Sequence, residues 1–131
     1  MLVKMCDFYD KASANWCQKL RNEALYVMTG LLTDPIHYQP ILSSLSETTL
    51  RRTIHIFMES LTHQTKFNIL QQLLNAFNYI LQADRGQSTL EALNIEARLE
   101  ELALLSENEI VKQAVNELLD MHLRQGENRL Y

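Results

Sequence analysis

Glycine and proline are scarce in this chain of 131 residues, which contains only 3 Gly and 2 Pro. Folds built from short strands and tight turns need many such residues, so their scarcity argues against a strand-rich fold. No apolar run approaches the roughly 20 residues that span a bilayer, and the start MLVKMCDFYD carries acids where a secretory leader is apolar. At 47% hydrophobic residues the chain is too apolar for disorder. We therefore expect a soluble, all-α protein without an export signal.

Clustered basic residues are also missing. The net charge is -4, and residues 91–131 hold 9 acids against 4 bases. Nucleic-acid binding needs grouped Lys and Arg to displace counterions, so we expect no direct nucleic-acid partner and no membrane partner. The acidic C-terminal part favours a basic protein partner, with a solvated helix face as the alternative. The two cysteines, Cys6 and Cys17, are expected to be free thiols.

Helical periodicity is what the sequence has in abundance. Apolar residues recur at spacings of three and four over residues 15–33, 46–61, 65–82 and 106–125, with shorter helices expected near 41–45, 88–94 and 96–105. The segment 65–82 carries two adjacent apolar stripes, so it must be covered on two sides. Ser46 or Thr48 is expected to cap the second of these helices. Gly86 is expected to end the third in a left-handed conformation, and Gly126 to end the last.

Three helices also resemble one another, since each places an alanine before large aliphatic residues. Ala24, Ala76 and Ala114 lie 52 and 38 residues apart, which brackets the roughly 40 to 47 residues of armadillo and HEAT units. This predicts a single domain, an α-solenoid of about three armadillo-type helical repeats. The approximate repeats are 19–63, 64–94 and 95–125, with a capping helix over 1–18 and a frayed tail over 126–131. A closed helical bundle around the three alanines is the alternative.

The residues of these helices resemble one family. LRNEALYVMTGLLT and KFNILQQLLNAFNYILQAD are similar to the third helices of consecutive importin-alpha armadillo repeats, and ARLEELALLSENEIVKQAVNELLDMHL is similar to the last, atypical repeat. The match covers about residues 20–123. The resemblance implies a non-enzymatic adaptor of the cytoplasm and/or nucleus. Its partner would be a protein or peptide, such as a karyopherin or another nuclear transport component.

The resemblance also suggests a binding site on the concave third helices. Members of the family use a Trp followed four residues later by an Asn, and these positions fall here on Tyr26 and Gly30 and on Asn75 and Tyr79. Tyr26 keeps an aromatic face for cation–π contact, worth about 0.5 to 2 kcal/mol, whereas Gly30 has no side chain to hold a peptide backbone. We therefore do not expect recognition of an ordinary nuclear localisation signal. The predicted partner-binding residues are Glu23, Tyr26, Asn75, Asn78 and Tyr79, and the acidic last repeat is a second candidate surface.

Other chemistry finds little support in the sequence. No glycine-rich phosphate loop is present, and the histidines are not at metal-ligand spacing, so no cofactor, metal or catalytic residue is expected. Arg51 and Arg52 could grip an acidic partner or form a solvated face. Trp16 with Phe8 and Tyr9 could form an exposed aromatic anchor or pack under the first helix. The second function considered is a structural subunit that homodimerises or docks into an assembly through an open solenoid end.

Overall fold

The structure is a computed structural model that describes residues 2–15 and 17–130, and within them the chain forms helices and loops but no strand. The helices in this part are α1 (Leu2–Ala14), α2 (Gln18–Leu32), α3 (Tyr38–Ser44), α4 (Glu47–Glu59), α5 (Phe67–Gln82), α6 (Asp84–Ala92), α7 (Ile95–Leu105) and α8 (Glu109–Leu130). The side chains of residues 84 and 124–130 are outside the described part. The all-α prediction is confirmed.

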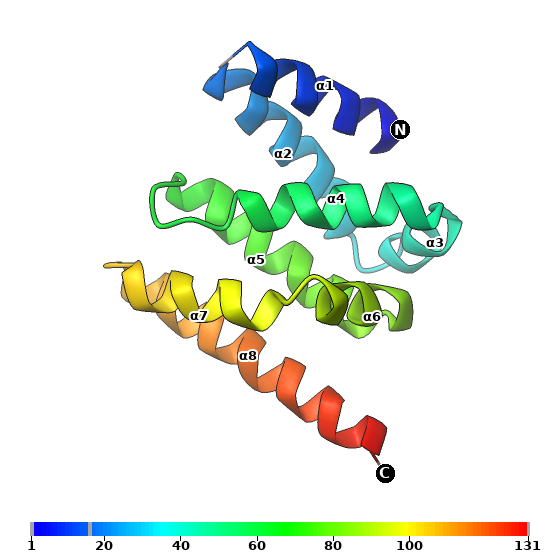
Figure 1. Cartoon of the computed structure of the whole chain (residues 1–131), viewed down its shortest axis with the longest axis vertical. Coiled ribbons are helices and arrows are strands. Elements are labelled where there is room, and N and C mark those ends of the chain that lie inside the picture. The colour runs from blue at the N-terminus through cyan, green and yellow to red at the C-terminus, as the bar shows by residue number, and fades with distance from the viewer. Residues whose placement is uncertain (1, 16, 131) are drawn as a thin grey trace.

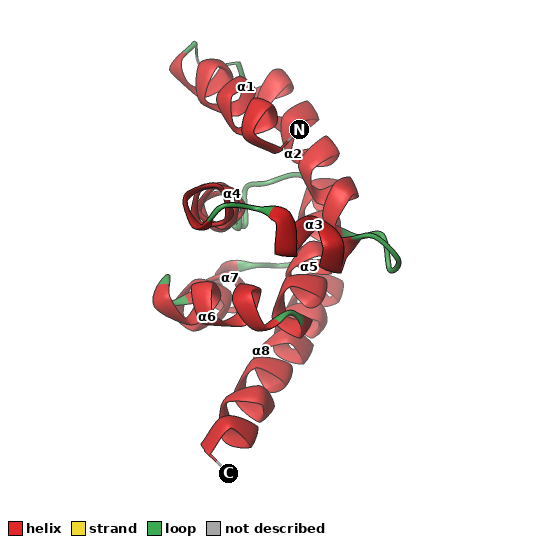
Figure 2. Cartoon of the chain, turned by 90° about the vertical axis from the view of Figure 1, so that its right-hand side faces the viewer, coloured by secondary structure: helices red, strands yellow, loops and turns green. Residues whose placement is uncertain are grey.

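The helices form two layers in an open, elongated stack. Helices α2, α5 and α8 run one below the other, while α1, α4 and the α6–α7 pair make up the second layer (Figures 1 and 2). Contacts pass from α2 to α5 and from α5 to α8 within one layer, and from α1 to α4 and from α4 to α6 within the other. The two termini lie at opposite ends of the stack (Figure 1). Ala24, Ala76 and Ala114 therefore do not meet around one axis, as they would in a closed bundle.

The order of short and long helices repeats along the chain. A short helix is followed by two longer ones in α3–α4–α5 and again in α6–α7–α8, whereas α1 and α2 have no short helix before them in the described residues. This order begins again after the loop at residues 33–37 and after residue 83. The approximate repeats 19–63, 64–94 and 95–125 stay a prediction from the sequence.

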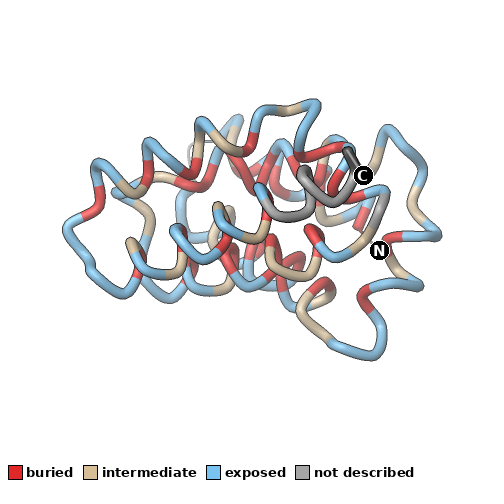
Figure 3. The backbone as a smooth tube through the Cα atoms, turned by 90° about the horizontal axis from the view of Figure 1, so that it is seen from below, coloured by how far each residue is buried: buried red, intermediate tan, exposed pale blue. Residues whose placement is uncertain are grey.

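The hydrophobic core lies between the two layers, where buried residues gather (Figure 3). Phe57 of α4 meets Phe77 of α5 edge to face, with 6.1 Å between the ring centroids, and both rings are fully buried. Such aromatic pairs contribute about 0.5 to 1.5 kcal/mol beyond the burial of their area. Helix α5 contacts α2, α6 and α8, so the prediction that this segment is covered on two sides is confirmed.

The start of α4 follows the sequence closely. Ser46 is the residue before the helix, and its hydroxyl oxygen accepts a hydrogen bond from the backbone N–H of Thr49 at 3.2 Å. This bond satisfies one of the backbone donors that the first turn of a helix leaves unpaired. Of the two predicted caps, Ser46 is therefore the one that acts.

Two predictions about glycines are wrong. Gly86 does not end α5 in a left-handed conformation, because α5 ends at Gln82 and Gly86 lies inside α6 without a positive φ. A Cβ atom on Gly86 would lie 2.3 Å from the carbonyl oxygen of Ile80, so glycine is needed there for close approach of α6 to α5. Gly126 does not end the last helix, since α8 continues to Leu130. A single glycine costs only about 1 kcal/mol inside a helix, which a long helix tolerates.

The first helix covers one end of the stack. Helix α1 packs on α2 and α4 and buries Leu2, Cys6 and Tyr9, within the segment 1–18 expected to act as a cap. Arg52 of α4 donates a hydrogen bond to Asp10 of α1 at 2.6 Å and so ties the two helices together. The predicted role of Trp16 lies outside the described residues.

Candidate functional site

The exposed side of the layer formed by α2, α5 and α8 carries three adjoining hollows, and we call this surface the α2–α5–α8 face. The first hollow, of about 730 Å³, is lined by Gln18, Lys19, Asn22, Glu23, Tyr26, Val27, Lys66 and Ile69. The second, of about 400 Å³, is lined by Tyr26, Asn68, Gln71, Gln72 and Asn75. The third, of about 440 Å³, lies between α5 and α8 and is lined by Phe67, Gln71, Leu74, Asn75, Asn78, Ile110, Val111, Ala114, Glu117, Leu118 and Met121.

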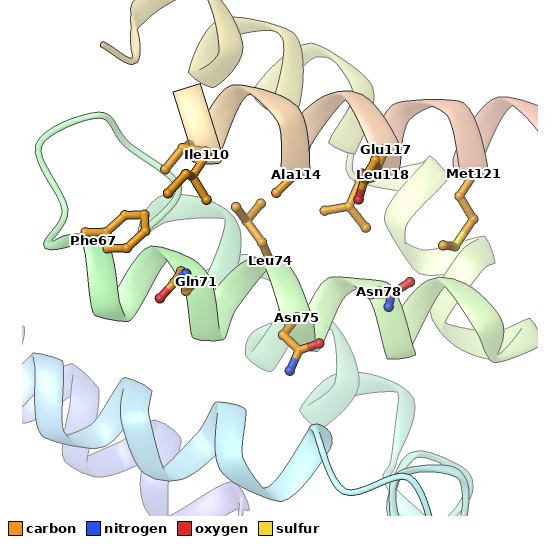
Figure 4. A pocket seen from close by; sticks show the side chains of 11 residues that line it. Phe67, Gln71, Leu74, Asn75, Asn78, Ile110, Ala114, Glu117, Leu118 and Met121 are labelled. Atoms are coloured by element: carbon orange, nitrogen blue, oxygen red, sulfur yellow. The ribbon is translucent and has the colours of Figure 1, made fainter. Parts of the chain in front are cut away.

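Shared residues join the three hollows into one surface. Tyr26 borders the first and the second, and Gln71 and Asn75 border the second and the third. Tyr26 is 55% exposed, so its ring stands free for contact with a bound chain. The side chain of Asn75 lies at the edge of α5 that faces α2 (Figure 4). The α2–α5–α8 face therefore runs from the first turns of α2 to the middle of α8.

The structure brings four of the five predicted binding residues to this face. Glu23 and Tyr26 border the first hollow, Tyr26 and Asn75 share the second, and Asn75 and Asn78 border the third. The fifth, Tyr79, is half-buried and lies against Tyr38 of α3, with 4.8 Å between the ring centroids. The described lining of the three hollows does not include Tyr79, and its ring packs one helix against another.

Helical geometry explains why no side chain follows Tyr26 one turn further along the same side of α2. The next position on the same side of α2 is Gly30, and a Cβ atom built there would meet no heavy atom within 4 Å. The space beside Tyr26 is therefore open. On α5 the corresponding positions carry Asn75, whose amide can both donate and accept hydrogen bonds, and the packed ring of Tyr79.

The charges around the hollows differ from one end of the face to the other. Lys19, Lys66 and Glu23 border the first hollow, and the second has a polar, uncharged lining of amides and one tyrosine. Glu117 is the charged side chain on the described lining of the third hollow, and it is exposed. An extended chain bound along the face would thus meet opposite charges at one end and a single negative charge at the other.

The third hollow includes residues that the sequence analysis missed. Ile110 and Glu117 of α8 and Gln71 of α5 line it, and none of them is among the five predicted binding residues. Ile110, Ala114, Glu117 and Met121 recur at spacings of three and four, which is the signal of a second stripe along α8. A stripe of mixed polarity beside an apolar stripe looks, from the sequence alone, like a solvent-exposed helix face.

The basic residues of α4 are engaged within the chain. Arg52 donates to Asp10 and, at 3.3 Å, to Asp7, and the hydrogen bond to Asp10 raises the pKa of Arg52. Arg51 lies 3.7 Å from Glu47 in an exposed pair. Both guanidinium groups therefore have an acidic neighbour within the chain.

Several other kinds of site can be compared with the structure. Cys6 is buried, Cys17 is half-buried, and both are free thiols, as predicted. In the part of the chain that the structure describes, no cluster of three or more His, Cys, Asp or Glu could hold a metal ion. No helix in that same part is long and apolar enough to cross a bilayer.

Comparison with known proteins gave no match: no family model, no curated protein and no solved structure matches this chain. The resemblance of residues 20–123 to importin-alpha stays a prediction from the sequence.

Proposed function

We propose that this chain is a non-enzymatic protein-binding adaptor, built as an α-solenoid of about three armadillo-type units. In this proposal, α1–α2, α3–α4–α5 and α6–α7–α8 are the units, and α2, α5 and α8 are their binding helices. The resemblance to the C-terminal repeats of importin-alpha and the repeated order of short and long helices support it. A partner segment lies along the α2–α5–α8 face.

The observation that carries the proposal is the continuity of the three hollows. Packed helices lie roughly 8 to 10 Å apart, so the path from α2 across α5 to α8 measures roughly 16 to 20 Å. An extended chain covers about 3.3 Å per residue. The α2–α5–α8 face therefore accommodates about five or six residues of an extended peptide, with Tyr26 on α2 and Asn75 on α5.

Binding suits this surface better than catalysis. General acid–base chemistry needs titratable groups that converge on one reacting atom in an enclosed site. Here Glu23 and Glu117 border different hollows on different helices. The partner class is a protein or peptide, and the resemblance points to a karyopherin or another nuclear transport component in the cytoplasm and/or nucleus.

The proposal is tested with a double substitution, Tyr26→Ala with Asn75→Ala. Both residues are exposed helix positions, so the double variant should unfold at an unchanged temperature. Peptides selected from a random displayed library on the purified chain should bind the double variant at least tenfold more weakly, because an aromatic contact and an amide contact are lost together. Ile36→Ala with Asn15→Ala removes an exposed apolar side chain and an exposed amide elsewhere and is the control. Equal binding by the double variant would refute this site.

A second function is favoured by the apolar side chains at the α7–α8 end of the stack. Leu104 is 82% exposed, and Ile110 and Leu123 are also largely exposed. An open stack leaves one side of its last unit uncovered, and a second copy or a larger assembly would bury these residues. Light scattering at micromolar concentration tests this structural role. The homodimer would be refuted if the parent chain and Leu104→Ser both have the molecular mass of a monodisperse monomer.

A further inference from the structure

The third hollow of the α2–α5–α8 face, which we call the α5–α8 groove, is built differently from the other two. Its floor is apolar, because Leu74, Val111 and Leu118 are buried beneath it. The side chains of Phe67 and Ile110 stand at one end of the groove, and Met121 stands at the other (Figure 4). Ala114 lies between them and leaves space because its side chain is a single methyl group. Such a lining favours an apolar side chain over the stem of a lysine or arginine.

One polar atom at this groove lacks a partner. The Oδ1 atom of Asn78 is buried and makes no hydrogen bond, although buried acceptors are paired in most native structures. Asn78 lines the groove across from Met121 (Figure 4). A turn of the Asn78 side chain toward the groove would let this oxygen accept a hydrogen bond from a backbone N–H of a bound segment. A hydrocarbon tail or a membrane surface would leave this oxygen unpaired.

The charge at the groove favours a particular kind of residue next to the apolar side chain of a bound peptide. Glu117 borders the groove on α8 and is exposed, and its carboxylate accepts a hydrogen bond from the uncharged amide of Gln113 at 3.5 Å. The bases Lys19 and Lys66 border the first hollow and not this one. A cationic residue next to the apolar residue of a bound segment would therefore meet a negative charge that no base of the described lining neutralises.

We propose that the α5–α8 groove binds an extended peptide segment through one large aliphatic or aromatic side chain, flanked by a Lys or Arg. The apolar side chain lies over Leu74 and Ala114, the peptide backbone donates to Asn78, and the basic residue approaches Glu117. This rests on the proposed function and deepens it. The anchor residue is apolar, unlike the basic residues that importin-alpha holds on its tryptophan array, and it lies away from Tyr26.

The test uses random peptides of about eight residues displayed against the full chain, followed by affinity measurement of the enriched peptides as synthetic probes. We expect enriched peptides to combine a large apolar residue with an adjacent Lys or Arg. Ile110→Ser should weaken their binding about fivefold to tenfold, because the substitution removes apolar area from the wall of the groove. Leu104→Ser removes a similar exposed apolar side chain outside the groove and should change binding less than twofold.

Charge is tested separately from shape. Glu117→Lys should weaken the basic peptides at least tenfold and strengthen versions in which Glu replaces the basic residue. Glu100→Lys changes an exposed acid of α7 outside the groove lining and should have little effect. All these positions are exposed, and unchanged melting temperatures verify that the variants are folded.

The outcomes separate this inference from the proposed function. Enriched peptides that lack an apolar residue, or that bind Ile110→Ser as tightly as the parent chain, overturn the groove proposal. If Tyr26→Ala with Asn75→Ala still weakens the binding of those peptides, the proposed function stands without the groove proposal. A library that yields no binding peptide overturns both. Light scattering that detects a second copy, with dissociation caused by Ile110→Ser, would assign the groove to self-association and also overturn the proposal.

Discussion

Gly30 and Gly86 both lie inside helices, and their replacement by alanine should change stability in opposite directions. Gly30 lies inside α2, is exposed and leaves open space where a Cβ atom would go. Alanine lowers the conformational entropy of the unfolded chain and favours the helix, so Gly30→Ala should stabilise the protein by about 0.5 to 1 kcal/mol. For a chain of this size, that raises the melting temperature by roughly 2 to 5 °C.

Gly86 should show the opposite sign because its surroundings are crowded. A Cβ atom would lie 2.3 Å from the Ile80 carbonyl oxygen and 2.6 Å from its Cγ2, and Ile80 is fully buried. The carbonyl oxygen cannot move without shifting the end of α5, and the Ile80 side chain is packed in the core, so overpacking should cost about 1 to 3 kcal/mol. The gain in helix propensity, about 0.5 to 1 kcal/mol, offsets only part of this cost.

Thermal and urea unfolding, followed by far-UV circular dichroism, measure both substitutions. Gly86→Asn separates crowding from backbone conformation. Asparagine adopts the left-handed conformation more readily than alanine, so a left-handed Gly86 would be replaced better by Asn. Crowding predicts that Asn, which is larger, is worse than Ala. Stabilisation by Gly86→Ala, or a smaller loss with Asn than with Ala, would refute the close approach of α6 to α5.

Two further predictions concern local hydrogen bonds. Ser46→Ala removes the oxygen that caps Thr49 and should cost about 1 kcal/mol in urea unfolding, whereas Ser46→Asp should retain most of the stability; equal loss in both would contradict a capping role. The hydrogen bond from His37, at 2.6 Å, holds the pKa of Asp34 below its ordinary value, with help from the N–H of Ile36. A carboxyl with a lower pKa in the folded state stabilises it above the unfolded pKa and loses this effect as pH falls through the folded pKa. An NMR titration should therefore find a higher Asp34 midpoint in His37→Ala, and an unchanged midpoint would exclude the contact.

Much of the local structure could be predicted because helices are specified by neighbouring residues. The doubled apolar stripe of 65–82 correctly predicted a helix covered on two sides, and Ser46 was recognised from its position before an amphipathic segment. Both features depend on spacing within about four residues. Gly86 was assigned wrongly because its role depends on contact with Ile80 of another helix, which no local pattern records.

The candidate site was predictable only in part. The positions of Tyr26 and Asn75 on exposed helix faces followed from helical periodicity, but their meeting in one hollow depends on how α2 packs against α5. Tyr79, four residues after Asn75, packs against Tyr38 because α3 returns to that side of α5. A ring that is accessible on an isolated helix can thus be occupied by a neighbouring element.

The sequence by itself determined that this chain is helical, where most of its helices lie and which of their faces are apolar, because these depend on residues one or two turns apart. Only the tertiary structure decided the open stack, the division into layers and the α5–α8 groove. Ile110 and Glu117 of α8 line one groove together with Asn78 of α5 through the packing of two helices remote in sequence. The free energy that holds these helices in place comes from the apolar surface buried between the layers. The pattern of apolar residues in the sequence is compatible with more than one packing of the helices, so it does not fix this arrangement.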